Sequence, residues 1–166
     1  MPQDITVPCG DGIVNVRVGA ILLKDGKFLM AGNRRCDYLY SVGGRIQFGE
    51  TAEEAVIREV REETGWELEI DRLGFVHENY FMGDMGAKAG KPIYELSFFF
   101  YMKVPEDFEP VSGSFTEEGT GEQLFWVAPD DPRVMYPVFF REELKCPEPG
   151  VKHLTTDERK QESSKE

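Results

Sequence analysis

Residues 44–66 read GRIQFGETAEEAVIREVREETGW and carry the strongest helix signal of the chain. Thr51 and Glu54 have the spacing of a capping box, in which each side chain accepts a hydrogen bond from the other residue's backbone. Gly65 stands where a left-handed residue commonly ends a helix. The segment therefore predicts one well-capped helix over residues 51–64.

Three glutamates gather on one side of this helix. At ~100° per residue, Glu59, Glu62 and Glu63 share a face, and Val56 and Val60 beside them are expected to face the core. Like charges at i+3 and i+4 destabilise a helix by ~0.2–0.5 kcal/mol per pair, and a bound divalent cation removes that cost. Mg²⁺ prefers carboxylates, water and phosphates as ligands. The helix alone leaves two readings open, a metal site and a solvated acidic face.

The same segment resembles the Nudix box at every fixed position. That pattern is a Gly, five residues, a Glu, seven residues, and then Arg-Glu-hydrophobic-any-Glu-Glu-any-Gly-hydrophobic. A chance match in a chain of this length has odds on the order of one in 10⁸. Many members begin the box with Pro-Gly-Gly, whereas this chain has Val42-Gly43-Gly44. The matching residues are Gly44, Glu50, Arg58, Glu59, Val60, Glu62, Glu63, Gly65 and Trp66.

The resemblance implies a metal-dependent hydrolase that cuts phosphoanhydride bonds. Carried over by position, Glu59, Glu62 and Glu63 are metal ligands, and the backbone carbonyl of Gly44 adds another. Arg58 orients the glutamates through charge-assisted hydrogen bonds, and Glu50 fixes the loop or reaches a metal through water. The implied cofactor is Mg²⁺, with Mn²⁺ as a substitute. Such ions neutralise phosphate charge, lower the pKa of a bound water and stabilise the leaving phosphate.

The proton acceptor varies within this family between a box glutamate and a residue on a later loop. The later candidates are Glu117, Glu118 and Glu122, just before a predicted strand. We rank Glu118 and Glu122 first, because the Glu-Gly-Thr-Gly-Glu segment resembles the loop that carries this residue in some members. The alternative for each is an exposed loop carboxylate.

Substrate contacts are less specific in the sequence. Arg34, Arg35 and Arg45 lie near the box and are candidates for phosphate contacts, with ordinary surface arginines as the alternative. Tyr80 lies near a position associated with dinucleoside polyphosphate hydrolases. It is one of four aromatic residues that either stack on a base or pack on the sheet; the others are Tyr38, Tyr40 and Phe81. We expect His77 and His153 to be structural.

The resemblance favours hydrolysis of a nucleoside diphosphate linked to another moiety X. One alternative is a nucleoside triphosphate pyrophosphohydrolase that removes damaged or surplus nucleotides. Another is a non-catalytic Nudix-like domain that binds a nucleotide and regulates another process. Such domains usually lose box glutamates, and this chain keeps all of them.

Composition indicates which class of partner and which cellular compartment to expect. A net charge of −12 opposes binding to a nucleic-acid backbone, so the expected partner is a small nucleotide. The apolar runs are too short to span a bilayer, and the N-terminus lacks a secretory signal. Cys9, Cys36 and Cys146 form neither a disulfide framework nor a zinc pattern, which fits the cytoplasm. Many relatives are homodimers, and the sequence leaves the oligomeric state open.

The pattern predicts a single α+β domain over residues 1–154, with a mixed sheet flanked by helices in the α/β/α Nudix fold. Residues 1–12 are expected to be irregular, residues 83–91 to form a mobile glycine-rich loop, and residues 155–166 to be a disordered tail. A second helix is expected over residues 138–144. Strands are expected over residues 13–22, 27–31, 38–42, 67–81, 93–104 and 124–127.

Overall fold

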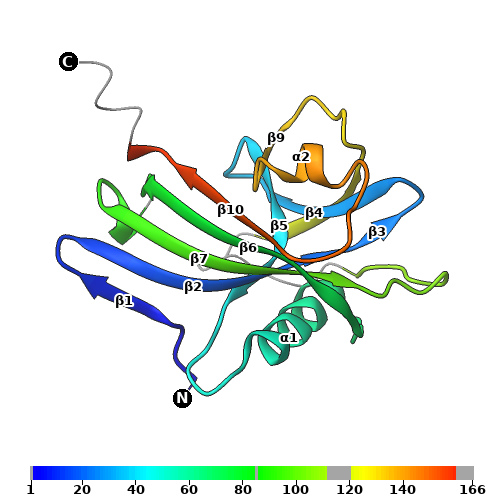
Figure 1. Cartoon of the computed structure of the whole chain (residues 1–166), viewed down its shortest axis with the longest axis horizontal. Coiled ribbons are helices and arrows are strands. Elements are labelled where there is room, and N and C mark those ends of the chain that lie inside the picture. The colour runs from blue at the N-terminus through cyan, green and yellow to red at the C-terminus, as the bar shows by residue number, and fades with distance from the viewer. Residues whose placement is uncertain (1, 85, 112–120, 160–166) are drawn as a thin grey trace.

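The computed structural model describes residues 2–84, 86–111 and 121–159. Within these residues, a mixed sheet of ten strands has helix α1 (Ala52–Thr64) on one face and the short helix α2 (Phe140–Glu143) on the other (Figure 1). This arrangement confirms the predicted α+β fold. No helix in the described part of the chain is long and apolar enough to cross a membrane.

The strands pair in an order that mixes parallel and antiparallel neighbours. The main path is β10-β6-β7-β2-β5-β4-β3, with β1 on β2, β8 on β4 and β9 on β5. The pairs β10–β6, β2–β7 and β5–β9 are parallel. The bounds are β1 Thr6–Cys9, β2 Gly12–Ile21, β3 Leu23–Lys24, β4 Lys27–Asn33, β5 Tyr38–Arg45, β6 Ile70–Met82, η1 Gly86–Lys88 (a 3₁₀ helix), β7 Pro92–Met102, β8 Glu122–Val127, β9 Val134–Tyr136 and β10 Lys152–Asp157.

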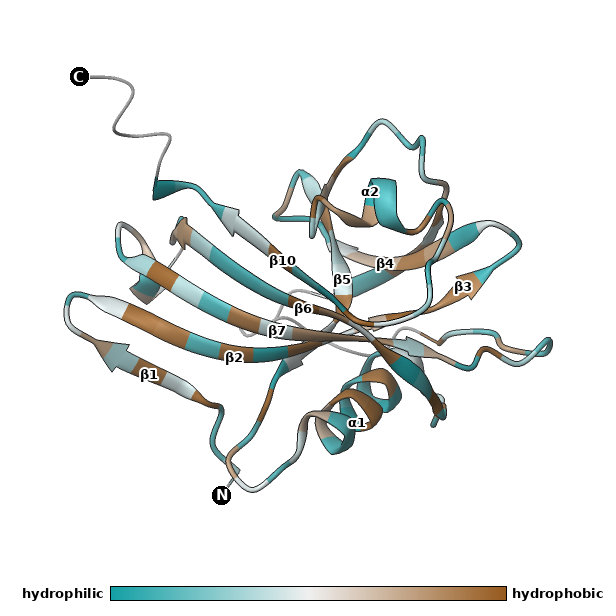
Figure 2. Ribbon diagram, in the orientation of Figure 1, coloured by the Kyte–Doolittle hydropathy of each residue, from teal (hydrophilic) through white to brown (hydrophobic). Residues whose placement is uncertain are grey.

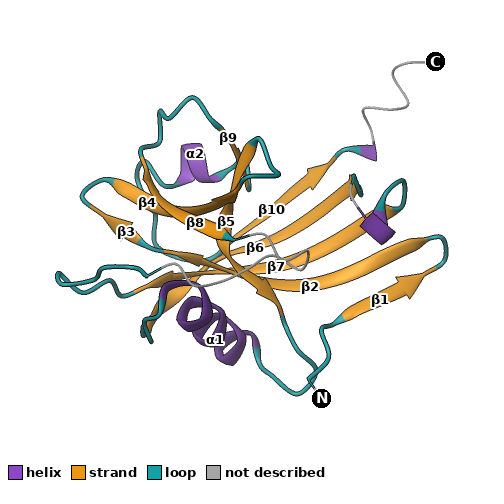
Figure 3. Ribbon diagram, turned by 180° about the vertical axis from the view of Figure 1, so that it is seen from behind, coloured by secondary structure: helices purple, strands orange, loops and turns teal. Residues whose placement is uncertain are grey.

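β5 connects the two halves of the sheet and leads into the box. Its later residues, from Val42 to Arg45, pair with β2, while Tyr40 and Ser41 pair with β4. Seen from behind, the sheet splays where β5 leaves β2 (Figure 3). The Gly43-Gly44 segment therefore lies where the two halves separate, near the start of the loop that leads to α1.

Two hydrophobic clusters cover the two faces of the sheet. Under α1, Val18 and Ala20 of β2 and the following Leu22 pack with Val56 and Val60 of the helix, all at 2% exposure or less. On the other face, a second cluster includes Phe28, Phe99 and Phe140, and joins the strands to α2. The strands are accordingly most hydrophobic where they cross above α1 (Figure 2). The first of these clusters holds α1, and with it the box glutamates, against the sheet.

The capping signals act as predicted. The Thr51 hydroxyl accepts a hydrogen bond from Glu54 N at 3.2 Å, and the Glu54 carboxylate accepts one from Thr51 N at 2.8 Å. Gly65 ends the helix with φ 78°, a conformation that costs glycine little. The helix bounds Ala52–Thr64 confirm the prediction.

Several expectations from the sequence are wrong at the edges of the sheet. The segment expected to be an irregular lead-in forms β1, which pairs with β2 from Thr6 to Cys9. The tail expected to be disordered from residue 155 is ordered through the end of β10, where Thr156 Oγ1 lies 2.8 Å from His77 Nε2. α2 is shorter than the predicted helix over residues 138–144. Residues 160–166 lie outside the described part.

Candidate active site

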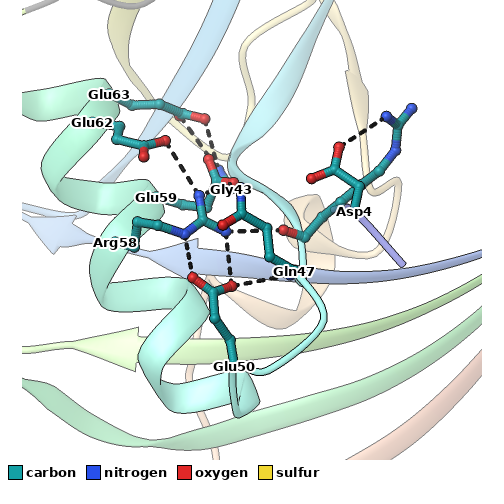
Figure 4. A network of polar contacts seen from close by, with 9 residues as sticks. Asp4, Gly43, Gln47, Glu50, Arg58, Glu59, Glu62 and Glu63 are labelled. Carbon is teal, nitrogen blue, oxygen red and sulfur yellow. Dashed lines mark hydrogen bonds and ion pairs between the residues drawn. The ribbon is translucent and has the colours of Figure 1, made fainter. Parts of the chain in front are cut away.

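Arg58 lies at the centre of a polar network that connects α1 to the loop before it, residues 46–51. Its Nε and Nη2 donate to the two carboxylate oxygens of Glu50, and Nη2 also donates to the carbonyl of Arg45 at 3.1 Å. Its Nη1 donates to Glu59 at 2.8 Å and to Glu62 at 3.3 Å (Figure 4). One guanidinium therefore holds the loop carboxylate and two helix carboxylates in fixed relation.

Glu50 anchors the loop that precedes the helix. Its Oε2 accepts a hydrogen bond from Gln47 N at 3.0 Å in addition to those from Arg58. The Arg58 hydrogen bonds hold the pKa of Glu50 below its usual range. Of the two roles predicted for this residue, the observed contacts are those of a loop anchor.

The three helix glutamates differ in burial. The Glu62 side chain is 54% exposed and that of Glu59 is 14% exposed, whereas Glu63 is 7% exposed as a whole residue. Both Glu63 oxygens lie 3.3 Å from Gly43 N, which donates to them. Burial raises the pKa of Glu63 well above its usual value, and the charges of Glu122 and Glu59 raise it further. Burial also raises the pKa of Glu59, against the opposing effect of Arg58.

Glu122 joins this group from a distant part of the chain. It is the first residue of β8 and pairs with Asn33 of β4. Burial raises its pKa, while a hydrogen bond with Tyr40 lowers it in part. Its charge acts on Glu63, so the carboxylates of α1 and β8 are near neighbours. The other two loop candidates, Glu117 and Glu118, lie outside the described residues.

Arg17 of β2 is a neighbour of this group that the sequence did not reveal. Its positive charge lowers the pKa of Glu59, Glu63 and Glu122. Strand alternation alone indicated an outward-facing arginine of β2. Its closeness to the carboxylates depends on pairing with β5 and β7, which lie far away in the sequence.

The donor set fits a hard divalent cation. A Cβ atom on Gly44 would lie 2.4 Å from Glu59 Oε1, so any larger residue would displace this carboxylate from its place beside the loop. Carboxylates and a backbone carbonyl are the ligand types that Mg²⁺ prefers. As the side chains stand, no three acidic, histidine or cysteine residues in the described part converge into a metal cage. Arg58 instead neutralises Glu59 and Glu62.

The predicted substrate residues are scattered. Arg34 lines a cavity of about 200 Å³ at the ends of β4 and β5, together with Phe125 and Arg133. The backbone N–H of Arg35 donates a hydrogen bond to Asn33 Oδ1 at 2.8 Å. The Arg45 guanidinium lies 3.3 Å from Asp4. Tyr80 lies on β6, with its ring against Tyr94 and under the guanidinium of Arg159 at 3.6 Å. Of these residues, Arg45 lies in the box itself, next to Gly44, whereas Tyr80 makes a separate aromatic contact.

The sequence matches the family model of the NUDIX domain over residues 14–144. The chain belongs to the Nudix family. The matched range runs from β2 to just after α2. It contains α1 and the strands β5 and β8, which carry Gly43, Gly44 and Glu122. As a Nudix hydrolase, the protein is expected to use its glutamate helix for chemistry on phosphoanhydrides.

Solved structures of Nudix proteins share the fold. A MutT NUDIX hydrolase from Burkholderia pseudomallei is 27% identical, with 71% of this chain and 85% of that chain covered and a TM-score of 0.50. A MutT protein from Bacillus halodurans is 18% identical, with 87% and 92% covered and a TM-score of 0.58. An ADP-ribose pyrophosphatase from Streptococcus suis is 14% identical, with 86% and 98% covered and a TM-score of 0.55.

Replacing Gly44 with alanine is expected to lower turnover of this Nudix hydrolase at least ~10-fold, an effect of the size seen for misplaced groups near a reaction centre. The added methyl group would displace the Glu59 carboxylate, which lies 2.4 Å from its position. Steady-state kinetics and thermal unfolding of the purified variant would measure this. Wild-type turnover in a folded variant would show that the position of Glu59 is unimportant.

The contribution of Glu63 to stability without metal is expected to fall as the pH rises. The raised pKa of Glu63 means that its protonated form favours folding, and that this contribution is lost as the pH rises through the folded-state pKa. Glu50 acts oppositely, but only below its ordinary pKa. The buried His77, whose pKa is lowered to about 4, has the opposite effect below about pH 6.5 in wild type and variant alike, so the test compares the slopes of unfolding temperature against pH in EDTA. The Glu63→Gln variant should show a flatter profile, and an equal slope in both proteins would refute the assignment.

Proposed function

We propose that this Nudix hydrolase uses Mg²⁺ to cleave the pyrophosphate link of a nucleoside diphosphate joined to another moiety X. Membership of the family supports hydrolysis of phosphoanhydrides in general. The observation that carries the proposal is the set of three glutamates on α1, of which Glu59 and Glu62 are held by Arg58 and Glu63 lies near Glu122. A merely structural helix gains nothing from gathering like charges at partly buried positions.

Glu59, Glu62 and Glu63, with the carbonyl of Gly44, would hold Mg²⁺ or Mn²⁺. When bound, the ion neutralises phosphate charge and lowers the pKa of a coordinated water. Arg58 keeps two of these carboxylates oriented, and Glu50 keeps the preceding loop against the helix.

A carboxylate must accept the proton of the attacking water. Glu122 is our first candidate among the described residues, because it faces Glu63 and because burial brings its pKa closer to neutral pH. Glu118 is the second candidate and lies in the segment outside the described residues. The Glu122→Gln and Glu118→Gln variants, compared by pH–rate profile, would separate them.

The small-molecule partner is a nucleotide. We propose a cytoplasmic enzyme, since Cys9, Cys36 and Cys146 are all free thiols. The net charge of −12 argues against a nucleic-acid polymer as partner. Oligomeric state, for which we propose a homodimer, would follow from light scattering.

Product analysis tests the substrate class. The purified protein would be incubated with Mg²⁺ and ADP-ribose, nucleotide sugars, dinucleoside polyphosphates, or normal and oxidised nucleoside triphosphates. Our proposal expects a nucleoside monophosphate and a phosphorylated X. Release of pyrophosphate from triphosphates alone would favour the pyrophosphohydrolase alternative. A chain that binds these nucleotides and cleaves none of them would fit a regulatory domain.

A further inference from the structure

A row of polar residues crosses five strands on one face of the sheet. The register pairs Thr6 with Asn15, Asn15 with Glu95, Glu95 with Asn79, and Asn79 with Thr156. Directly opposed residues project to the same face of a sheet, so one side chain from each of β1, β2, β7, β6 and β10 forms this polar row.

The row lies on the face of β2 opposite α1. Val16 and Val18, which alternate with Asn15 and Arg17, pack into the cluster beneath the helix. Arg17 is two residues along from Asn15, and its Nε lies 3.8 Å from Glu95 Oε1. The Arg17 and Glu95 side chains are 33% and 19% exposed, so this loose ion pair is reachable from solvent.

Asn15 is a buried polar residue with an unused acceptor. It is 2% exposed, and its Oδ1 has no hydrogen-bond partner among the described residues. The buried hydroxyl of the adjacent Thr6 is in the same condition. Buried polar atoms are nearly always paired, and an unpaired one costs folding free energy. A molecule that donates hydrogen bonds at this place would satisfy both groups.

Arg17 connects the polar row to the glutamates. It pairs in register with Arg45 of β5, directly beside Gly44, and its charge acts on Glu59, Glu63 and Glu122. Arg45 has Asp4 at 3.3 Å, whereas Arg17 makes the longer 3.8 Å contact to Glu95, so Arg17 is the arginine placed to attract a phosphate. A phosphate near Arg17 would thus be adjacent both to the catalytic carboxylates and to the acceptors of Glu95 and Asn15.

We propose that Arg17, Glu95 and Asn15 form a sugar-phosphate subsite, in which Arg17 contacts a phosphate of the substrate and the other two accept hydrogen bonds from adjacent sugar hydroxyls. The inference rests on the proposed function and names the group that determines specificity. A carboxylate and an amide oxygen are acceptors, which suits a vicinal diol. The sugar is either the moiety X or the ribose of the nucleoside.

Nucleotide binding in EDTA tests the subsite without turnover. Calorimetric Kd values would be compared for ADP-ribose against ADP, which reports on a terminal sugar, and for ADP against 2′-deoxy-ADP, which reports on the nucleoside ribose. In one of these pairs, the sugar hydroxyl should improve binding about tenfold, the effect of one hydrogen bond to a charged acceptor. Glu95→Gln and Asn15→Leu should each remove most of that preference.

The matched control is Glu69→Gln, since Glu69 has a side chain that is 82% exposed and pairs only with Lys103 among the contacts described. It should keep the wild-type preference. Asn15→Leu should also raise the unfolding temperature, because it removes an unsatisfied buried group. If Asn15→Leu fails to fold, Glu95→Gln carries the test alone.

Two results would overturn the subsite. One is wild-type protein with no preference in either pair, or no binding of any of these nucleotides. The other is an undiminished preference in Glu95→Gln, which would mean that a water or another residue serves the buried acceptors. The subsite stands, and the proposed hydrolysis fails, if the preference depends on Glu95 but Mg²⁺ brings no cleavage of any nucleotide.

Discussion

Glu62→Gln is expected to lower Mg²⁺-dependent turnover by at least ~10²-fold, comparable to the loss of one group that stabilises a transition state. The amide removes a negative ligand from the most exposed of the three helix glutamates. The fold should be almost unaffected, with the free energy of unfolding within ~0.5 kcal/mol of wild type, because one like-charge pair is relieved while one exposed contact to Arg58 weakens.

The matched control for this variant is Glu53→Gln on the first turn of the same helix, where the side chain is exposed. It removes the same charge and should keep wild-type kinetics. Equal kinetics for Glu62→Gln and Glu53→Gln would contradict the metal-ligand assignment, since both variants change the net charge alike.

Arg58→Ala should impair both stability and activity. It leaves the carboxylates of Glu50 and Glu59 without their shared cation, although each is less than 20% exposed. Breaking a fully buried pair costs 3–5 kcal/mol, and partial exposure reduces this to about 2 kcal/mol. Chemical denaturation would measure the loss. Turnover should fall as well, because Glu59 and Glu62 lose the group that orients them.

Arg58→Lys separates charge from geometry. A lysine keeps the positive charge but cannot reproduce the several directed contacts of the guanidinium. It should recover part of the stability and little of the activity. Full recovery of activity by lysine would mean that charge alone accounts for Arg58.

Local signals in the sequence were enough to predict the centre of the fold. The helix bounds follow from the Thr51–Glu54 capping box and from Gly65, each of which acts within four residues. The turn at Asp25 and Gly26 is likewise local and joins β3 to β4, with Lys24 paired to Lys27. The strand periodicity of residues 13–22 likewise reflects burial against α1 on one face.

Local sequence patterns did not predict the strands at the edges of the sheet. β10 reads KHLTTD, which has one large apolar residue, and it is a strand because it pairs in parallel with β6 some 75 residues earlier, as in Lys152 with Phe75. β1 contains Pro8 and, among the described strands, pairs with β2 alone. Edge strands bury little surface, so their composition resembles that of loops.

The same limit applies to the candidate site. The box residues are contiguous, so a motif predicts their spacing. Arg17 and Glu95 come from β2 and β7, and their closeness depends on strand register, which one sequence does not specify. Asn15 is only 2% exposed although it is a polar residue that alternates with Val14 and Val16 in the strand, a burial that local sequence does not predict.

Mn²⁺ binding followed by electron paramagnetic resonance tests the central claim most directly. The wild-type protein should bind the ion, and a variant with Glu59, Glu62 and Glu63 all replaced by glutamine should not. The control is the triple replacement of Glu53, Glu67 and Glu69, which removes the same charge from exposed positions and should bind like wild type. Equal Mn²⁺ binding by the two triple variants would contradict a metal site on α1.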